Sequence, residues 1–509
     1  MDNKKKEILL QIEQAFRVSN EQLNQLVLGI NEEMKAGLDI MNRSTKNSSE
    51  LKMIPSYVTG YPTGNEKGTY LALEISGVDI YVCQVKLKGE GGKLAINQYQ
   101  YKIPDDLTAG DDIGDLIDYV ADCVGDFQKR VGAHKEIVYS MAISIGFAVL
   151  QTGLDKGKII ALEHGFDFPN VIGCDVVDLF DQRFRAKGLA VKIVAIANDG
   201  VCTLLAHAYQ HPSTRIGVIH SAGTNCAYYD KMSNIKQFRN EPNNQHDMII
   251  NTEWCNFGAR HLPLTEFDYL LDKQSNNPGV HNFEKMTTGM YLGEITRQVL
   301  IYLVNQKVLS FNNNTEEEEE EEGNLLMIPY QFDTSYMYVC EADQGDNLED
   351  TRLILEDMCR VGKTSLEDRK IVKDVCEWVG YRAALLLGAS IASVVKYMFE
   401  CGIGLNEEKK GFAIAISGDV YKDYPSFHPR VCEAIKNLIP DEVASKLSVG
   451  IVQHSRIVGA AIVAMMAEKM YNLNSKQQGD IIMDDDDDDD EDDDDDDDEE
   501  EEDDDEIIV

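Results

Sequence analysis

The chain has 509 residues, 43% of them hydrophobic, which is enough to form at least two domain cores. Its formal charge is −41, but 30 acidic residues lie in two runs, 316–322 and 484–506, and without them the charge is −11. The rest of the chain is therefore an ordinary acidic protein, and this composition argues against nucleic-acid binding.

The two acidic runs carry no apolar side chains to bury, and their charges repel one another. We therefore expect a disordered internal loop at 312–323 and a disordered tail at 473–509. If the tail has a protein partner, the complementary class is a basic one, and salt would weaken the contact.

Eleven cysteines are scattered singly between positions 83 and 432, with no C-x-x-C pair and no metal-ligand spacing. We expect reduced thiols, no metal ligand set, and a cytoplasmic protein, with the nucleus as the alternative. The first residues lack the apolar core of a signal peptide, and the apolar run IVGAAIVAMMA is shorter than a bilayer span. Neither secretion nor membrane insertion is expected.

An apolar stripe at helical spacing begins the chain and is interrupted once. Its members are Ile8, Ile12 and Phe16, then Leu23, Leu26, Ile30 and Met34. Ser19 and Gln22, between the two parts, have the spacing of a capping box, which starts a second helix. We expect residues 1–64 to supply N-terminal helices that pack on a larger domain.

Strand and helix patterns follow from residue 70. Three strands come first, then a helix, a strand, a helix and a strand: TYLALEIS, DIYVCQVKL, LAINQYQY, IGDLIDYVADCVGDFQKRV, IVYSMAISI, DVVDLFDQRFRAKG and VKIVAIA. Strands begin again at RIGVIHS, which predicts an α/β protein with mixed sheets and a structural duplication. We expect a small domain at 65–199, a large domain at 200–454, and a final helix at 455–472 that rejoins the small domain.

Several separated segments resemble one family, the hexokinases of the fungal and animal type. They are MIPSYVTGYPTGNEKGTYLALE, GFDFPNVIGCDVV, FEKMTTGMYLGE, and FDTSY followed by NLEDT. The resemblance covers about residues 14–472. It implies the hexokinase fold, two actin-like (RNase H-like) domains around a central cleft. It also implies phosphorylation of a hexose with Mg-ATP as the cofactor.

The resemblance implies site residues one by one. Asp199, after the strand VKIVAIA, aligns with the family's catalytic base, and Asn198 and Asp199 align with hexose contacts. The other implied hexose contacts are Asn225 in AGTNCAYYD, Glu253 in INTEW and Glu284 in FEKMTTG. Singly, such residues are typical of turns, helix caps and surface acids. Their joint presence favours a retained sugar pocket.

Part of the implied pocket differs from the family. The family's F-S-Y-P-x-S-Q aligns with IGFAVLQ, which places Leu150 where a serine donates to the sugar. In the family's W-T-K-G-F, the Thr and Lys become Glu163 and His164, so a cation that faces the reacting groups is replaced. Loss of one transition-state donor commonly costs about a hundredfold to a thousandfold in rate.

The phosphate loops differ further. The first loop, D-L-G-G-T-N, aligns with E-I-S-G-V-D at 74–79, where only Gly77 remains of two glycines and Asp79 adds a negative charge. Glu74 replaces the Asp that supports the metal's water shell. The second loop, G-T-G-x-N, aligns with S-A-G-T-N at 221–225, which keeps Gly223 but loses a threonine hydroxyl.

The adenosine segment D-G-S-V-Y becomes S-G-D-V-Y at 417–421, which keeps Gly418, and a later G-S-G becomes S-R-I at 455–457. Gly77, Gly223 and Gly418 are therefore the candidate cofactor-binding residues, in loops altered enough to predict weak Mg-ATP binding. Arg456 adds a cation to this region.

Two functions follow from these residues. The first is a hexose-binding member of the family, with glucose as an example ligand, whose catalysis is impaired or lost and whose role is regulatory. The alternative is an active ATP-dependent hexokinase that makes hexose 6-phosphate in glycolysis, with a phosphate site rebuilt around Arg456.

Overall fold

The structure is a computed structural model that describes residues 3–40, 49–134, 136–145, 148–162, 166–241, 244–311, 323–403 and 412–479. For 473–479 only the backbone is described. The disordered loop was predicted at 312–323 and the disordered tail at 473–509, and of these 312–322 and 480–509 lie outside the described residues, as do Glu163 and His164. Residues 473–479, predicted as disordered, instead extend the final helix.

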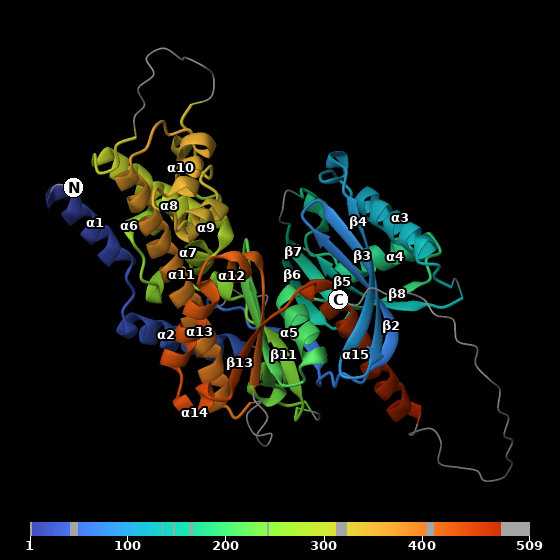
Figure 1. Ribbon diagram of the computed structural model, residues 1–509. Helices are drawn as coiled ribbons and strands as arrows, with labels where there is room; N and C mark the ends of the chain where they lie inside the picture. The colour runs from blue at the N-terminus through green and yellow to red at the C-terminus, as the bar shows by residue number, and fades with distance from the viewer. Residues whose placement is uncertain are drawn as a thin grey trace, which may run out of the picture.

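Two sheets with the same strand order define two lobes (Figure 1). The small-lobe sheet has the order β4-β3-β2-β5-β8, and the large-lobe sheet has the order β1-β11-β10-β9-β12-β13. Apart from β1, each sheet consists of three antiparallel strands followed by two parallel ones, so the predicted duplication is confirmed. The small-lobe strands are β2 (Lys67–Ser76), β3 (Asp79–Gly89), β4 (Lys93–Lys102), β5 (Tyr139–Ile145) and β8 (Val191–Ile196). The large-lobe strands are β1 (Ile54–Thr59), β9 (Thr214–His220), β10 (Thr224–Lys231), β11 (Asp247–Asn251), β12 (Phe412–Ser417) and β13 (Leu447–Ile451).

Helices α5 (Asp199–Gln210) and α15 (Ser455–Gly479) lie between the two sheets (Figure 1). Helix α15 packs on β2, β5 and α5, and α5 packs on β9 and β10. A methyl group on Gly459 would lie 2.1 Å from the backbone oxygen of Cys202, so only glycine permits this approach of the two helices. Helices α3 (Gly114–Arg130) and α4 (Val176–Ala186) belong to the small lobe.

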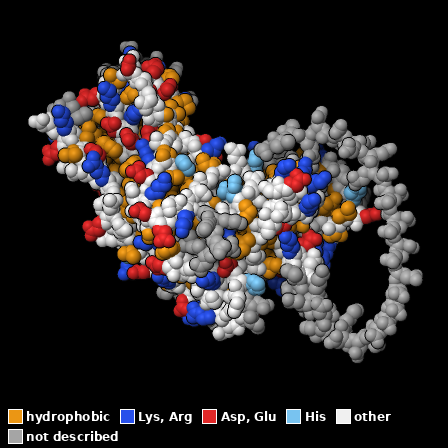
Figure 2. All heavy atoms as spheres, turned by 60° about the horizontal axis from the view of Figure 1, so that its bottom comes forward, with side chains coloured by type: hydrophobic (Ala, Val, Ile, Leu, Met, Phe, Trp, Pro, Cys, Tyr) orange, Lys and Arg blue, Asp and Glu red, His pale blue; other side chains and the backbone are white. Residues whose placement is uncertain are grey.

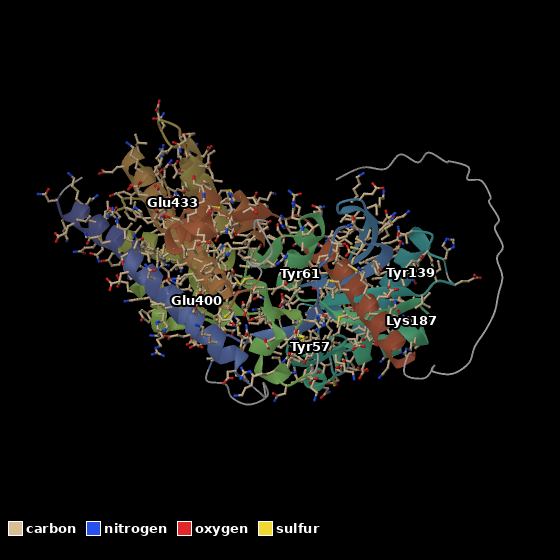
Figure 3. The ribbon with its side chains drawn as sticks, turned by 90° about the horizontal axis from the view of Figure 1, so that it is seen from below. Tyr57, Tyr61, Tyr139, Lys187, Glu400 and Glu433 are labelled. Carbon is tan, nitrogen blue, oxygen red and sulfur yellow. The ribbon has the colours of Figure 1, made fainter. Side chains whose placement is uncertain are left out.

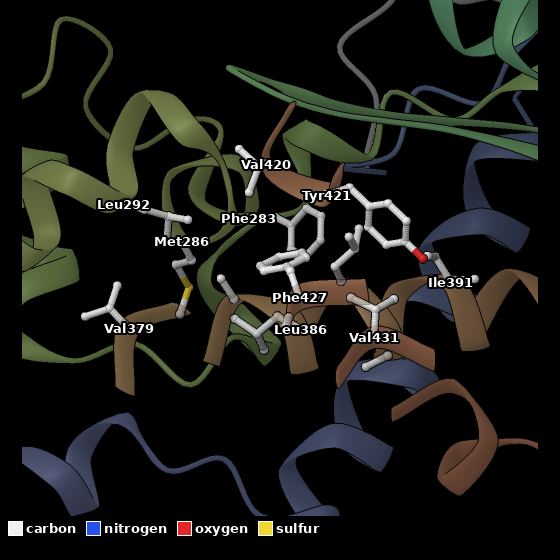
Figure 4. Packing of buried hydrophobic residues seen from close by; sticks show 14 of the residues in the cluster. Phe283, Met286, Leu292, Val379, Leu386, Ile391, Val420, Tyr421, Phe427 and Val431 are labelled. Carbon is white, nitrogen blue, oxygen red and sulfur yellow. The ribbon is translucent and has the colours of Figure 1, made fainter. Parts of the chain in front are cut away.

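The large lobe carries the remaining helices. They are α1 (Asn3–Phe16), α2 (Asn20–Leu38), α6 (Glu266–Gln274), α7 (Asn282–Thr287), α8 (Gly289–Asn305), α9 (Thr334–Ala342), α10 (Glu349–Leu353), α11 (Leu366–Glu400), α12 (Asp419–Asp423), α13 (Phe427–Leu438) and α14 (Asp441–Ala444). Figure 4 shows side chains of α7, α8, α11, α12 and α13 packed into one apolar core. Of the described helices, α11 alone is long and apolar enough to cross a membrane by length and composition, but 83% of its most apolar stretch is buried in this core.

The predicted capping box between the first two helices is confirmed. The backbone N–H of Gln22 donates to Ser19 Oγ at 3.2 Å, and the backbone N–H of Ser19 donates to Gln22 Oε1 at 2.9 Å. Helix α2 lies against α11, where Ser393 Oγ donates to the backbone oxygen of Val27 at 3.0 Å.

Three features differ from the prediction. Residues 54–59, expected in a helical region, form the edge strand β1, a position that tolerates the missing N–H of Pro55. A hairpin of β6 (Ala148–Gly153) and β7 (Lys156–Ala161) was not predicted, because its turn lacks an Asn-Gly type signal. The final helix runs to Gly479 rather than 472, since its last residues are mostly helix formers before a glycine.

Aromatic packing marks the junction between the lobes. Figure 3 shows Tyr61 close to α15, between the small lobe, where Tyr139 lies, and the large lobe, where Glu400 lies. The Tyr61 ring lies 4.3 Å from that of Tyr229, and the guanidinium of Arg215 lies 4.2 Å from its centroid. The chain between β1 and β2 is thus held where it passes from one sheet to the other.

The charged surface and the cysteines agree with what the amino-acid composition predicts. Basic and acidic side chains are interspersed on the face drawn in Figure 2. All eleven cysteines are unpaired thiols, and most of them are buried.

A buried ion pair joins α6 to α11. Both side-chain oxygens of Asp268 accept from Arg382, at 2.6 and 2.7 Å, and the two side chains are 3% and 0% exposed. Asp268 also caps its own helix by accepting from Thr265 at 2.7 Å, and the Arg382 guanidinium lies 4.5 Å from the centroid of the Phe16 ring in α1. One carboxylate therefore organises three helices.

Replacing Asp268 with alanine leaves Arg382 buried and unpaired, so we expect the free energy of unfolding to fall by about 3–5 kcal/mol. Urea unfolding followed by tryptophan fluorescence measures this change, because Trp254 and Trp378 both lie in the large lobe.

The matched control is Lys35→Gln, which removes an exposed partner of α11, paired with Glu400 at 3.4 Å. It should change the free energy of unfolding by less than about 1 kcal/mol. Equal effects of the two substitutions would contradict the importance of the buried pair.

Candidate functional site

Polar side chains from β10, from β11 and from the turn that follows β11 form a hydrogen-bonded cluster. Asn225 Nδ2 donates to Asn251 Oδ1 at 2.9 Å and to Glu253 Oε1 at 3.3 Å. Asn251 Nδ2 donates to the same Glu253 oxygen at 2.8 Å. Of these residues, Asn251 was not predicted. Its signal was an Asn at the end of an apolar strand, two positions before an acid.

The backbone of Glu253 is in the left-handed region, with φ of 52°, which for a non-glycine residue costs on the order of 1 kcal/mol. Its backbone N–H donates to Asn225 Oδ1 at 3.1 Å, which helps to hold this conformation. The hydrogen bonds to Asn225 and Asn251 therefore fix where the Glu253 carboxylate lies.

Glu284 lies beside this cluster, in the first turn of α7. Its Oε2 accepts from the backbone N–H of Thr224 at 3.0 Å, next to Asn225. The neighbouring Phe283 and Met286 are buried in the core drawn in Figure 4, and the Phe283 ring lies 5.9 Å from that of Trp254. Core packing therefore fixes the position of the carboxylate.

Asn198 and Asp199 lie where β8 ends and α5 begins. Asn198 is the helix cap that its residue type alone predicts, since its Oδ1 accepts from the backbone N–H of Gly200 at 2.9 Å. Burial raises the pKa of Asp199 above its ordinary value, while the positive charge of Arg456 lowers it and the charge of Glu284 adds to the rise. Asp199 is thus within electrostatic reach of both Arg456 and Glu284.

Three positions of the implied sugar site were predicted to differ from the family, and of these only Leu150 is among the residues that the structure describes. Leu150 lies half-buried in β6, opposite Lys158 of β7. Its effect on a ligand remains a prediction.

Three of the four predicted nucleotide segments come together around a cavity of about 260 Å³, and of the predicted glycines only Gly418 lines it. Its lining includes Ser221, Ser417, Gly418, Asp419 and Arg456, which come from three separate segments of the chain. The first phosphate loop forms the tight turn between β2 and β3, with Gly77 at a φ of 57° and Val78 41% exposed. A larger hollow, of about 490 Å³, is lined by Ile96, Asn97, Gln98, Tyr99, Arg130 and Val131 and contains none of the predicted residues.

Packing explains two of the retained glycines. A methyl group on Gly418, whose φ is 133°, would lie 2.1 Å from the backbone oxygen of His220. A methyl group on Gly223 would lie 2.8 Å from Glu284 Oε2. Gly418 thus requires glycine whether or not a phosphate binds there, because its neighbour is backbone and its φ is positive, whereas at Gly223 the end of the Glu284 side chain would have to shift.

Arg456 forms an ion pair with the first phosphate loop. Its Nη1 lies 2.7 Å from Glu74 Oε1 and donates to Ser76 Oγ at 3.3 Å. The preceding residue, Ser455, donates to Ser417 Oγ at 3.0 Å and accepts from Thr203 Oγ1 at 3.1 Å. The first two residues of α15 therefore contact the small-lobe sheet, α5 and the end of β12.

Comparisons with known proteins agree with this arrangement. Sequence profiles of the hexokinase family match residues 8–209 and 215–466. Hexokinase-1 of Schizosaccharomyces pombe is 32% identical over 469 residues, which cover 91% of this chain and 92% of that protein. Hexokinase-1 of Saccharomyces cerevisiae is 33% identical over 473 residues, 90% of this chain and 92% of that protein.

The solved structure of the hexokinase from Schistosoma mansoni, complexed with glucose, superposes with a TM-score of 0.78. It is 30% identical and covers 92% of this chain and 100% of its own. The predicted fold of two RNase H-like domains is thereby confirmed, and the chain belongs to the hexokinase family.

Proposed function

We propose that this protein binds a hexose, with glucose as the first candidate, and transfers phosphate to it poorly or not at all. The observation that carries the proposal is the contrast between two parts of one site. Asn225, Asn251 and Glu253 form an intact hydrogen-bonded cluster beside Glu284. Across from them, the first phosphate loop is paired with Arg456 of the chain itself.

The chemistry of the cluster suits a sugar. Each hexose hydroxyl donates one hydrogen bond and accepts others, so carboxylates and amides side by side complement it. Glu253, Glu284 and Asp199 supply acceptors, and Asn225 and Asn251 supply both donors and acceptors. The glucose in the Schistosoma mansoni relative supports a hexose as the ligand class.

Asp199 is the proposed residue for orienting the hydroxyl that a family member would phosphorylate. Its carboxylate accepts from the backbone N–H of Gly200 at 2.7 Å, which holds it at the start of α5. In this role it needs only to accept a hydrogen bond from the sugar, so it contributes to binding even without catalysis.

The residues present do not fit Mg-ATP, the cofactor that hexokinases generally use. Glu74, the predicted support for the metal's water shell, is 9% exposed and already paired with Arg456 at 2.7 Å. Val78 presents an apolar, exposed branch at the phosphate-loop turn, and Ala222 has no hydroxyl.

Titration of the purified protein with glucose should give a saturable signal with a dissociation constant in the millimolar range, because Leu150 removes one predicted donor, worth about 1–3 kcal/mol. Glu284→Gln should weaken binding at least about tenfold, since a carboxylate acceptor becomes an amide. Calorimetry or thermal shift with up to tens of millimolar glucose measures both effects.

The matched control is Glu266→Gln, which makes the same change in the first turn of α6, at an exposed position. It should leave the glucose signal unchanged. No saturable signal from the unmodified protein would contradict the proposal and leave an interaction role without sugar binding.

Hexose phosphorylation should be at least about a hundredfold slower than a typical enzyme turnover of about 10 per second, because donors are lost where phosphoryl charge develops. A coupled assay with micromolar protein, glucose and Mg-ATP measures this rate. Turnover of about 10 per second or faster would support the alternative, an active hexokinase that makes hexose 6-phosphate.

A further inference from the structure

Two carboxylates converge at one edge of the small-lobe sheet. Glu74 lies near the carboxyl end of β2, and Asp199 follows the carboxyl end of β8. Because β2, β5 and β8 run parallel, these ends meet at the same edge, where ligands of α/β sheets bind. Two negative charges at such an edge repel each other unless a cation lies between them.

Arg456 supplies that cation from the opposite direction, at the start of α15. It pairs with Glu74 at 2.7 Å and donates to Ser76 at 3.3 Å. Burial disfavours its charged form, but the negative charges of Glu74 and Asp199 outweigh burial and raise the pKa of Arg456. Both carboxylates therefore act on one guanidinium.

The thiol of Cys202 is affected by the same three charged side chains. Burial raises the pKa of the Cys202 thiol, the charges of Asp199 and Glu74 raise it further, and the charge of Arg456 lowers it. The same three charges thus act on one thiol, in the turn of α5 that meets Gly459 of α15.

We propose that Arg456 is a built-in cation that takes the place of a divalent metal ion between Glu74 and Asp199. A guanidinium is always charged and donates from several nitrogens, so it serves two carboxylates without any metal. The phosphate end of the site is then neutralised by the chain itself. Ser455 links the same helix start to β12, so the neutralised edge is also tied to the large lobe.

This inference goes beyond the proposed function, because it concerns a cation and not a hexose. Its test therefore uses no sugar, and loss of glucose binding would leave it standing. The measurement is the thermal unfolding temperature, Tm, in EDTA and in about 10 mM Mg²⁺.

The unmodified protein should show the same Tm in both conditions. Arg456→Gln leaves the two carboxylates uncompensated, so its Tm should fall in EDTA by about 2–4 °C or more and rise again with Mg²⁺. Arg456→Lys keeps a positive charge, so it should fold and should show no Mg²⁺ response.

The matched control is Arg430→Gln. Arg430 pairs with Glu341 at 2.7 Å and also lies 3.6 Å from Glu377, so it tests whether any arginine between two carboxylates gives the response, away from the sheet edge. Arg297→Gln is the one-carboxylate control, since Glu294, at 2.6 Å, is its only ion-pair partner among the described residues. The Tm of Arg297→Gln should fall without any Mg²⁺ response, and a Mg²⁺ response of Arg430→Gln as large as that of Arg456→Gln would show that the effect is not specific to the sheet edge.

The proposal is overturned if the unmodified protein gains stability from Mg²⁺ and Glu74→Gln removes that gain. It is also overturned if folded Arg456→Gln does not respond to Mg²⁺, or if Arg456→Lys does. Should Arg456→Gln not fold, the unmodified protein and the Lys variant decide the question.

Discussion

The contact between α5 and α15 is the constraint on which the rest of the site depends. Gly459 lies so close to the backbone oxygen of Cys202 that a methyl group would come within 2.1 Å of it. Each of these residues lies about one turn from a helix start, so the approach brings Asp199 and Arg456 into the same region. The same two helices lie between the two sheets. Their packing therefore sets both how the lobes are arranged and where Asp199 and Arg456 lie.

The two parts of the site on either side of this contact differ: one is a cluster of hydrogen-bonded side chains in the large lobe, and the other is an ion pair at the edge of the small-lobe sheet. In the large lobe, Asn225, Asn251 and Glu253 satisfy one another by hydrogen bonds, which fixes the positions of their polar groups. At the small-lobe edge, the negative charge of Glu74 is balanced by the positive charge of Arg456, a residue of the same chain. The proposed loss of phosphate transfer rests on this contrast between the two parts.

The retained glycines show why a motif alone is a weak guide to nucleotide binding. Gly418 and Gly223 survive in altered loops, yet each has a close neighbour in the chain itself. A methyl group on Gly418 would clash with the backbone oxygen of His220, and one on Gly223 would displace the carboxylate of Glu284. Close packing gives the same selection for glycine as close approach of a phosphate. The sequence therefore overestimates how much of the phosphate machinery these two positions represent.

The sequence by itself determined the elements whose periodicity is strong and local, such as the Ser19 capping box, the strand that ends before Asn198, and the duplicated strand order. It also determined the family, because motif residues are readable without coordinates. Only the tertiary structure decided that Asn251 joins the polar cluster and that Arg456 pairs with Glu74, 382 positions away. Such pairings depend on how helices pack between sheets, and no local pattern in the chain encodes which distant charge meets which.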